Sequence, residues 1–161
     1  KKLNKSEHEG LMIKRKNSAY ISGRPKGHWY KWKNEPLVVD AIMMYAQRGH
    51  GKRSSYYSDF TFGLWDKDNI VPICKAYFGF NNKELETLDK FVRNNTINKY
   101  GPVREVEKKF VVEIAFDSVD FSKRHKSGVA LRFPRIKRLR EDKPIEEVID
   151  LDLFRENFIN N

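Results

Sequence analysis

Apolar and polar residues alternate along most of this chain with the two-residue period that is typical of β-strands. The apolar positions are rich in valine, isoleucine and aromatic residues, and Gly-, Pro- and Asn-containing turns separate the runs. The runs predict strands at 11–15, 29–33, 37–46, 57–66, 70–80 and 110–116, and the start of another at 128–133. Pro134 should break the last strand or place it at a sheet edge. The pattern therefore predicts a mainly β protein.

Two segments depart from this period and predict helices. Residues 81–94 carry one apolar stripe at helical spacing, made of Leu85, Leu88, Phe91 and Val92. Asn81 stands where a helix N-cap is expected, and Glu84 follows three residues later, as in a capping box. After Pro144, residues 145–158 predict a weak terminal helix or two short ones.

From residue 37 onward the elements run as three strands, a helix and two more strands. This order is expected of an OB-fold, a five-stranded barrel with a helix between strands three and four. A small α+β domain of another kind would give a similar order, so the pattern leaves that alternative open. The two strands before residue 36 are too few to fold alone, and 34–36 have the composition of a short linker. We therefore expect two parts, 1–36 and 37–161, the second ending in a short helix.

Composition narrows the class of protein. A chain of 161 residues can form one domain with a real core and something smaller. A net charge of +10 favours a polyanionic partner, nucleic acid first, although a ribosomal or membrane-surface protein with a solvated basic face would have the same charge. The single cysteine, Cys74, excludes an internal disulfide and a cysteine cluster for zinc. No signal peptide or membrane span is predicted, and a reducing cytoplasm is expected.

Three peptides carry the residue types that phosphoryl transfer requires. They are EGLMIK at 9–14, WYKWK at 29–33 and LRFPRIKRLREDK at 131–143. In this order they resemble the fourth, fifth and sixth motifs of ATP-dependent DNA ligases. The first motif of those enzymes, Lys-x-Asp-Gly, carries the lysine that takes AMP, and it is absent from these 161 residues. The resemblance implies the C-terminal part of a ligase, with the end of the nucleotidyltransferase domain followed by an OB-fold domain, and no activity in isolation.

The resemblance assigns roles to residues near the start of the chain. Glu9 would bind the catalytic Mg²⁺, and Lys14 would lie near the nucleotide phosphate. Lys31 and Lys33 would face the α-phosphate of ATP or of the adenylate, and their spacing places both on one face of a strand. Without the resemblance, a solvated strand face beside a buried Trp32 would explain the same residues.

The final basic run carries the most specific part of the resemblance. Its sixth-motif residues would orient the pyrophosphate leaving group during lysine adenylation, and they are Arg138, Arg140 and Lys143. Arg132 and Phe133 match a pair that contacts the DNA minor groove beside the nick in eukaryotic relatives, and Arg135 adds to the same phosphate-binding cluster. Phe133 has an alternative role in the core, because it would share one strand face with Val129 and Leu131.

Other basic residues lie in predicted loops. Arg48, Lys52 and Arg53 resemble a basic loop of the relatives and are expected to contact the DNA backbone. The run at 123–126 is a second candidate for such a contact. Loops of this kind are often only solvated, so each residue taken singly is a weak candidate.

Together these assignments imply ATP and Mg²⁺ as cofactors. The implied partners are nicked double-stranded DNA and the remaining N-terminal part of a bacterial or archaeal ligase. No membrane partner is expected, and the enzyme is expected to be a monomer. Two alternatives stay open. A free-standing OB module for single strands would leave Glu9, Lys31 and Lys33 without a use. An mRNA capping enzyme or RNA ligase shares the architecture, but the final basic run is more like that of a DNA ligase.

Overall fold

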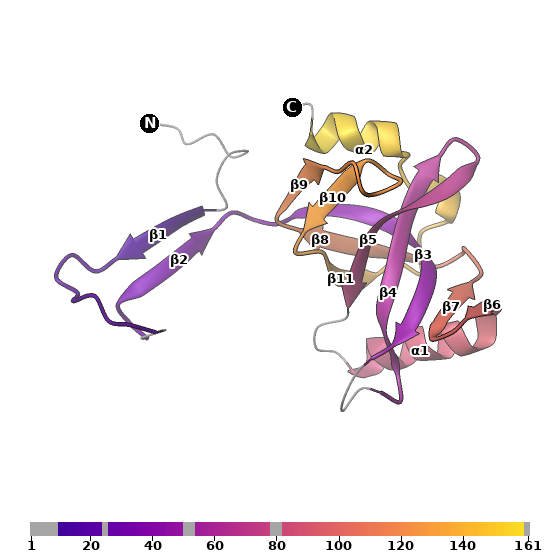
Figure 1. Ribbon diagram of the computed structural model, residues 1–161, viewed down its shortest axis with the longest axis horizontal. Helices are drawn as coiled ribbons and strands as arrows, with labels where there is room; N and C mark the ends of the chain where they lie inside the picture. Colours follow the sequence, from indigo (N-terminus) through magenta and orange to yellow (C-terminus); the bar gives the residue numbers. More distant parts are fainter. Residues whose placement is uncertain (1–9, 24–25, 50–53, 78–81, 160–161) are drawn as a thin grey trace. The chain divides into compact units, whose positions relative to one another are not determined.

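The computed structural model describes residues 10–23, 26–49, 54–77 and 82–159, and the chain divides into two compact units, 1–36 and 37–161. The first unit contains an antiparallel hairpin of β1 (Gly10–Lys14) and β2 (Trp29–Lys33) (Figure 1). Its register pairs Gly10 with Lys33 and Lys14 with Trp29. The predicted strands at the start of the chain are therefore present and paired with each other.

Gly10 is required by the close approach of the two strands. Its φ is +143°, and a Cβ atom at this position would lie 2.1 Å from the carbonyl oxygen of Trp32. A residue with a side chain would therefore force the strands apart. The space that a side chain would need is occupied by the backbone of Trp32 and Lys33.

The second unit is built on one mixed sheet with the strand order β4-β5-β11-β8-β3-β7-β6. In addition, β3 pairs with β4, so the pairings run from β3 through β4, β5, β11 and β8 and return to β3. These five strands are β3 (Leu37–Arg48), β4 (Tyr57–Asp66), β5 (Asn69–Tyr77), β8 (Val111–Phe116) and β11 (Arg135–Leu139). Their pairings are antiparallel except between β5 and β11, which are parallel and are joined, among the described residues, by the pair Arg135 and Tyr77.

The core lies inside this arrangement of strands, where the alternating apolar positions meet. Every residue of β8 is buried, as expected for a strand with neighbours on both sides. The largest fully buried side chains come from four strands and both α-helices, and include Ile42, Phe60, Phe62, Leu88, Val106, Ile114, Phe116 and Phe154. The mainly β class predicted from periodicity is confirmed.

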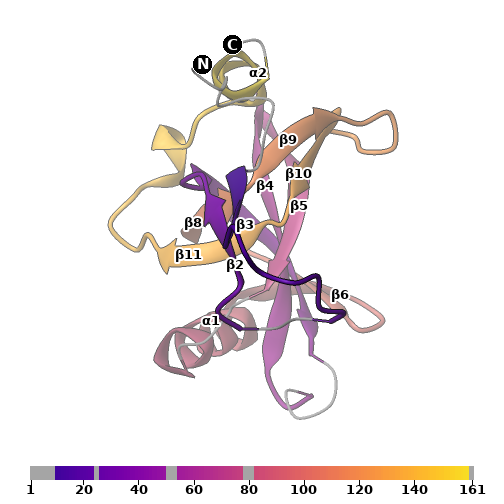
Figure 2. The same cartoon turned by 90° about the vertical axis from the view of Figure 1, so that its left-hand side faces the viewer.

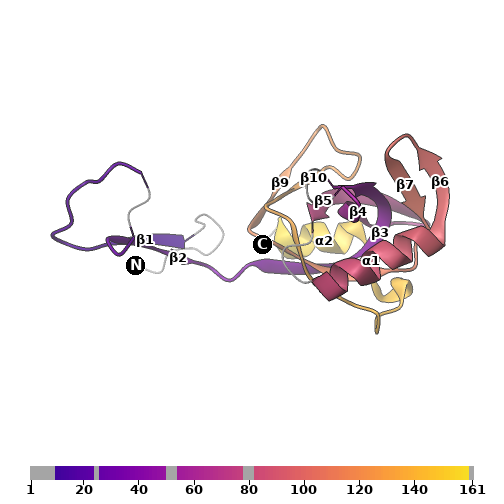
Figure 3. The same cartoon turned by 90° about the horizontal axis from the view of Figure 1, so that it is seen from below.

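Two α-helices lie at opposite ends of the second unit (Figures 1 and 2). α1 (Asn82–Asn95) follows β5 and buries Leu88 and Val92, and it leads directly into β6 (Thr96–Tyr100), as Figure 3 shows. The 3₁₀ helix η2 (Ile145–Glu147) precedes α2 (Leu151–Phe158). Among the described residues, no helix has the length and apolar character needed to span a bilayer.

The structure corrects the prediction for the last strand. The run expected to begin at residue 128 is β10 (Val129–Arg132), which pairs only with β9 (Ser118–Phe121) in a separate hairpin. The strand that joins the large sheet is β11, which starts after Pro134. Residues 96–106, for which no strand is predicted, form a hairpin of β6 and β7 (Val103–Val106). These additions enlarge the sheet without disturbing the predicted order of the core elements.

Candidate nucleotide and DNA interface

One face of the β1–β2 hairpin gathers three of the candidate lysines. The register pairs Met12 with Lys31 and Gly10 with Lys33, and side chains alternate between faces along a strand. Lys14, Lys31 and Lys33 therefore share one face. The ammonium nitrogen of Lys14 lies 4.8 Å from the centroid of the Trp29 ring, within the range of a cation–π contact. This face can bind an anion such as a phosphate.

The opposite face of the hairpin is apolar and exposed. It carries Leu11, Ile13, Tyr30 and Trp32, whose exposed fractions run from 48% to 67%. Trp32 itself is exposed, so the alternative that required a buried Trp32 does not describe this hairpin. A two-stranded sheet has no other layer against which to bury such residues.

Several predicted site residues fall outside the described parts of the chain. These are Glu9, the proposed Mg²⁺ ligand, and Lys52 and Arg53 of the basic loop. Arg48 is described, at the end of β3, with its guanidinium 5.6 Å from the centroid of the Tyr57 ring. Arg93 of α1 lies 5.7 Å from the same ring centroid. Arg48 and a residue of α1 therefore lie near the same aromatic ring.

Phe133 lies in a tight turn between β10 and β11, not in the core. Its side chain is 68% exposed and its φ is +56°, in the left-handed region that residues with side chains rarely adopt. Arg135 donates from Nη1 to the Phe133 carbonyl at 2.9 Å and to Asp117 Oδ1 at 3.1 Å. The backbone N–H of Asp117 donates to the carbonyl of Arg132. The turn is therefore fixed on both sides, and the core alternative for Phe133 is wrong.

The sixth-motif residues pack against carboxylates on neighbouring strands. Lys143 Nζ is 2.8 Å and Arg140 Nη1 is 3.1 Å from Asp40 Oδ2, on β3. Arg138 Nη2 lies 3.2 Å from Glu113 Oε2, on β8. Sequence reasoning selected the three cations but neither of these carboxylates.

A β-bulge explains how Glu113 meets two consecutive cations. The register of β11 and β8 shifts between Ile136 and Arg138, which places the neighbouring Lys137 beside the same carboxylate, 3.0 Å from Oε1. Burial by itself would raise the pKa of Glu113, but Lys137 and Arg138 outweigh it and hold the pKa below its usual value. Glu113 is therefore a charged, neutralised partner of the basic run at neutral pH.

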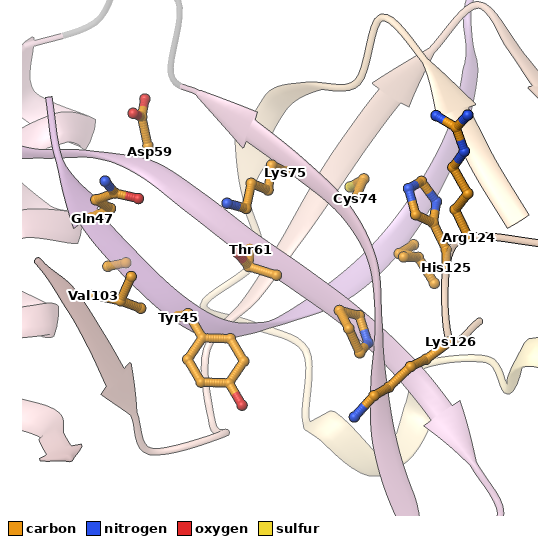
Figure 4. A pocket seen from close by; sticks show the side chains of 13 residues that line it. Tyr45, Gln47, Asp59, Thr61, Cys74, Lys75, Val103, Arg124, His125 and Lys126 are labelled. Carbon is orange, nitrogen blue, oxygen red and sulfur yellow. The ribbon is translucent and has the colours of Figure 1, made fainter. Parts of the chain in front are cut away.

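A groove of about 710 Å³ lies between the strands and the β9–β10 loop (Figure 4). Tyr45 and Thr61 come from the strands, and Arg124 and Lys126 come from the loop. His125 Nδ1 lies 2.9 Å from the carbonyl oxygen of Val129, which can only accept, so the ring donates and the loop is held. The groove joins an apolar floor to a basic rim.

Cys74 also lines this groove, and its thiol is poorly suited to nucleophilic attack. Burial raises the pKa of the Cys74 thiol to about 12, so the reactive thiolate is scarce at neutral pH. In the described parts of the chain, no cluster of three or more His, Cys, Asp or Glu side chains could hold a metal ion.

Comparison with known proteins identifies the family. The model of the ATP-dependent DNA ligase C-terminal region matches residues 53–143. A probable DNA ligase of Koribacter versatilis is 45% identical over 149 residues, which are 92% of this chain and 26% of the relative. DNA ligase 1 of Korarchaeum cryptofilum is 35% identical over 151 residues, which are 92% of this chain and 28% of the relative. The chain spans about a quarter of the length of these relatives.

Solved structures share the fold. The ligase domain of M. tuberculosis LigD superposes with a TM-score of 0.61 at 21% identity, over 88% of this chain and 47% of that chain. Mycobacterial DNA ligase D complexed with ATP and MES gives a TM-score of 0.56 at 18% identity, over 88% and 46% of the two chains. The resemblance seen in the three sequence motifs is confirmed, and this chain belongs to the family of ATP-dependent DNA ligases, in their C-terminal region.

Proposed function

We propose that this chain works as the C-terminal part of the catalytic core of an ATP-dependent ligase that seals nicks in duplex DNA. One observation carries the proposal: a single chain of this family contains both a lysine face, made of Lys14, Lys31 and Lys33, and the basic run 131–143. Sealing a nick consists of phosphoryl transfers, which depend on positioned cations around phosphate oxygens.

The two units have different proposed origins. Residues 1–36 are the end of the adenylation domain, and the exposed apolar face of their hairpin supports this, because it suits packing against further structure. Residues 37–161 are an OB-fold domain with a C-terminal tail. The return of the strand pairings to β3, and the position of α1 between the third and fourth strands of that ring, support a closed five-stranded barrel.

The proposed roles at the nucleotide follow from charge and position. Lys31 and Lys33 act at the α-phosphate of ATP and of the adenylate, with Lys14 beside them. Mg²⁺, held by Glu9, would add positive charge at the phosphates. Three cations bind the departing pyrophosphate in the adenylation step: Arg138, Arg140 and Lys143.

The proposed DNA contacts lie on the second unit. Arg132 and Arg135 bind phosphates beside the nick, and Phe133 enters the minor groove between them. The exposure of the Phe133 ring supports this role. Arg48, Lys52 and Arg53 contact the DNA backbone from their loop.

Complementation tests this function. This chain is mixed with an N-terminal ligase polypeptide that carries Lys-x-Asp-Gly, and lysine adenylation by ATP and nick sealing are measured separately. The mixture should perform both reactions, and the K31A/K33A variant of this chain should lose both. Lys16→Ala, in the exposed loop after β1, is the matched control and should retain both. If the wild-type mixture forms no lysine adduct and seals no nick, the proposal is wrong.

A free-standing module for single strands is the second candidate, and the groove beside Tyr45, Arg124 and Lys126 favours it. Binding separates the two functions. A ligase part should bind nicked duplex at least as tightly as single strands of the same length, whereas a single-strand module should prefer the single strands.

A further inference from the structure

Two carboxylates lie directly opposite each other beneath the basic run. Asp40 of β3 pairs in register with Glu113 of β8, and their side chains are only 15% and 10% exposed. Facing carboxylates on adjacent strands repel, and burial makes each charge more costly. The pair is therefore compatible with the fold only where cations are packed against it.

One short segment supplies all of these cations. Arg140 and Lys143 contact Asp40, and Lys137 and Arg138 contact Glu113. Arg140 also pairs through Nε with Asp142, whose side chain is 72% exposed. Even with Asp142 counted, the cations outnumber the carboxylates, so the cluster keeps positive charge for an anionic ligand.

The two halves of this cluster differ in exposure. The side chains of Arg140 and Lys143 are 19% and 18% exposed, whereas those of Lys137 and Arg138 are 53% and 57% exposed. Long basic side chains lose rotamer freedom when they are fixed before a ligand arrives, and that fixing reduces the entropy lost on binding. The carboxylates thus set where each ammonium and guanidinium group points.

We propose that Asp40 and Glu113 are positioning residues for lysine adenylation. This inference rests on the proposed function of the basic run. In that step the attacking lysine loses a proton and its nitrogen bonds to the α-phosphorus, while the bond to the bridging oxygen breaks and pyrophosphate departs with the electron pair. The carboxylates hold Arg138, Arg140 and Lys143 in the arrangement that binds this leaving group, with Lys137 beside Arg138 on the same carboxylate. Neither carboxylate touches ATP.

A positioning role and a simple charge effect predict opposite results. Asp40→Asn keeps the shape of the side chain but removes one negative charge from the cluster. By charge alone, the variant should attract pyrophosphate more strongly and adenylate at least as fast. If Asp40 orients Arg140 and Lys143, adenylation should instead fall by about tenfold or more, because small displacements at a reacting centre are costly.

The experiment uses this chain mixed with the N-terminal polypeptide carrying Lys-x-Asp-Gly. Rates of lysine adenylation at saturating ATP are compared with rates of sealing a nick that is already adenylated, a step that releases no pyrophosphate. Asp40→Asn and Glu113→Gln should slow adenylation and leave the second rate within about twofold of the wild type. Asp40→Glu should recover part of the loss. The control is Glu105→Gln on β7, which removes a carboxylate that pairs with Lys108. It should change neither rate.

The outcomes are distinct. Unchanged or faster adenylation in Asp40→Asn and Glu113→Gln would overturn the positioning role while the ligase function stands. An equal loss of both rates, together with a lower melting temperature, would make the pair purely structural and would also overturn it. If the wild-type mixture neither adenylates nor seals, the proposed function itself fails, and the inference fails with it.

Discussion

Phe133 combines two features that each carry a cost. A large aromatic ring is exposed to water, and the backbone beneath it adopts a left-handed conformation that costs about 1–2 kcal/mol for a residue with a Cβ atom. Arg135 and Asp117 hold the turn in place. Backbone strain that neighbouring hydrogen bonds maintain, as at Phe133, is common at functional sites.

Phe133→Gly should therefore separate stability from binding. We expect the free energy of unfolding to rise by about 1 kcal/mol as the strain is relieved, while affinity for nicked duplex DNA falls. Denaturant unfolding and DNA titration measure the two effects. Lys67, the other described non-glycine residue with positive φ, lies in the β4–β5 turn and provides the control. Lys67→Gly should gain similar stability with unchanged DNA affinity, and an equal loss of affinity in both variants would contradict the wedge role.

Glu113 predicts a pH dependence of stability. Its pKa is lower in the folded protein than the usual value of 4.5, so its contribution is fully present above about pH 4.5 and is lost as the pH falls through the folded pKa. The difference in unfolding free energy between wild type and Glu113→Gln should shrink in this acidic range, as measured by chemical denaturation at several pH values. A difference that is the same at every pH would show that the ion pairs of Glu113 with Lys137 and Arg138 do not stabilise the fold.

At the scale of single residues, the sequence predicts which side chains share a strand face but not which residues pair across the fold. Alternation alone placed Lys31 and Lys33 on one face, and the register of the hairpin agrees. Asp40 was missed because it is one carboxylate within an apolar run, and its partner Arg140 lies 100 positions away. Local patterns do not report such distant pairs.

α1 connects the core to the basic loop. The buried N–H of Tyr57 donates to Asp89 Oδ1 at 2.9 Å, and Arg93 Nε donates to Asp89 Oδ2 at 2.6 Å. Arg93 also donates to the carbonyl of Ser55. Asp89 thus fixes the end of the loop that follows β3.

Loss of the Asp89 carboxylate should lower the free energy of unfolding measurably. Asp89→Ala leaves the buried N–H of Tyr57 without its acceptor, and we expect a loss of about 1–3 kcal/mol in the free energy of unfolding. Asp152→Ala removes a similar ion pair, with Arg155, in which Asp152 is 89% exposed, and it should cost little. Urea unfolding compares the free energies of unfolding of the two variants. Equal decreases would show that Asp89 contributes no more than an exposed surface charge.

The strands with a buried face were predictable, and the polar ones were not. The prediction of 57–66 coincides with β4, and the predictions for β3, β8 and α1 differ from the structure by one or two residues at an end. β6 has almost no buried residue, so it shows no apolar alternation. β11 has the sequence RIKRL, in which only Ile136 is buried, and such a run has the pattern of a charged loop. Tertiary pairing, not local periodicity, makes these segments strands.

For the molecule as a whole, the net charge of +10 predicts binding that depends strongly on salt. The logarithm of the affinity for nicked duplex should fall linearly with the logarithm of salt concentration, with a slope of about −0.9 for each phosphate contact. Arg48→Ala should reduce the magnitude of that slope by about one contact. Lys108→Ala, whose ammonium already pairs with Glu105, should leave the slope unchanged. A slope that is the same in all three proteins would exclude Arg48 from the DNA interface.

The place of β11 in the sheet has a consequence for the whole domain. β11 meets β8 over four residue pairs, and among the described residues Arg135 and Tyr77 join it to β5. β11 lies within the basic run, so an anion that binds the run binds a strand of the ring itself. We therefore expect a bound polyphosphate to stabilise the domain, and its resistance to heat and to hydrogen exchange should become a measure of how fully the anion site is occupied.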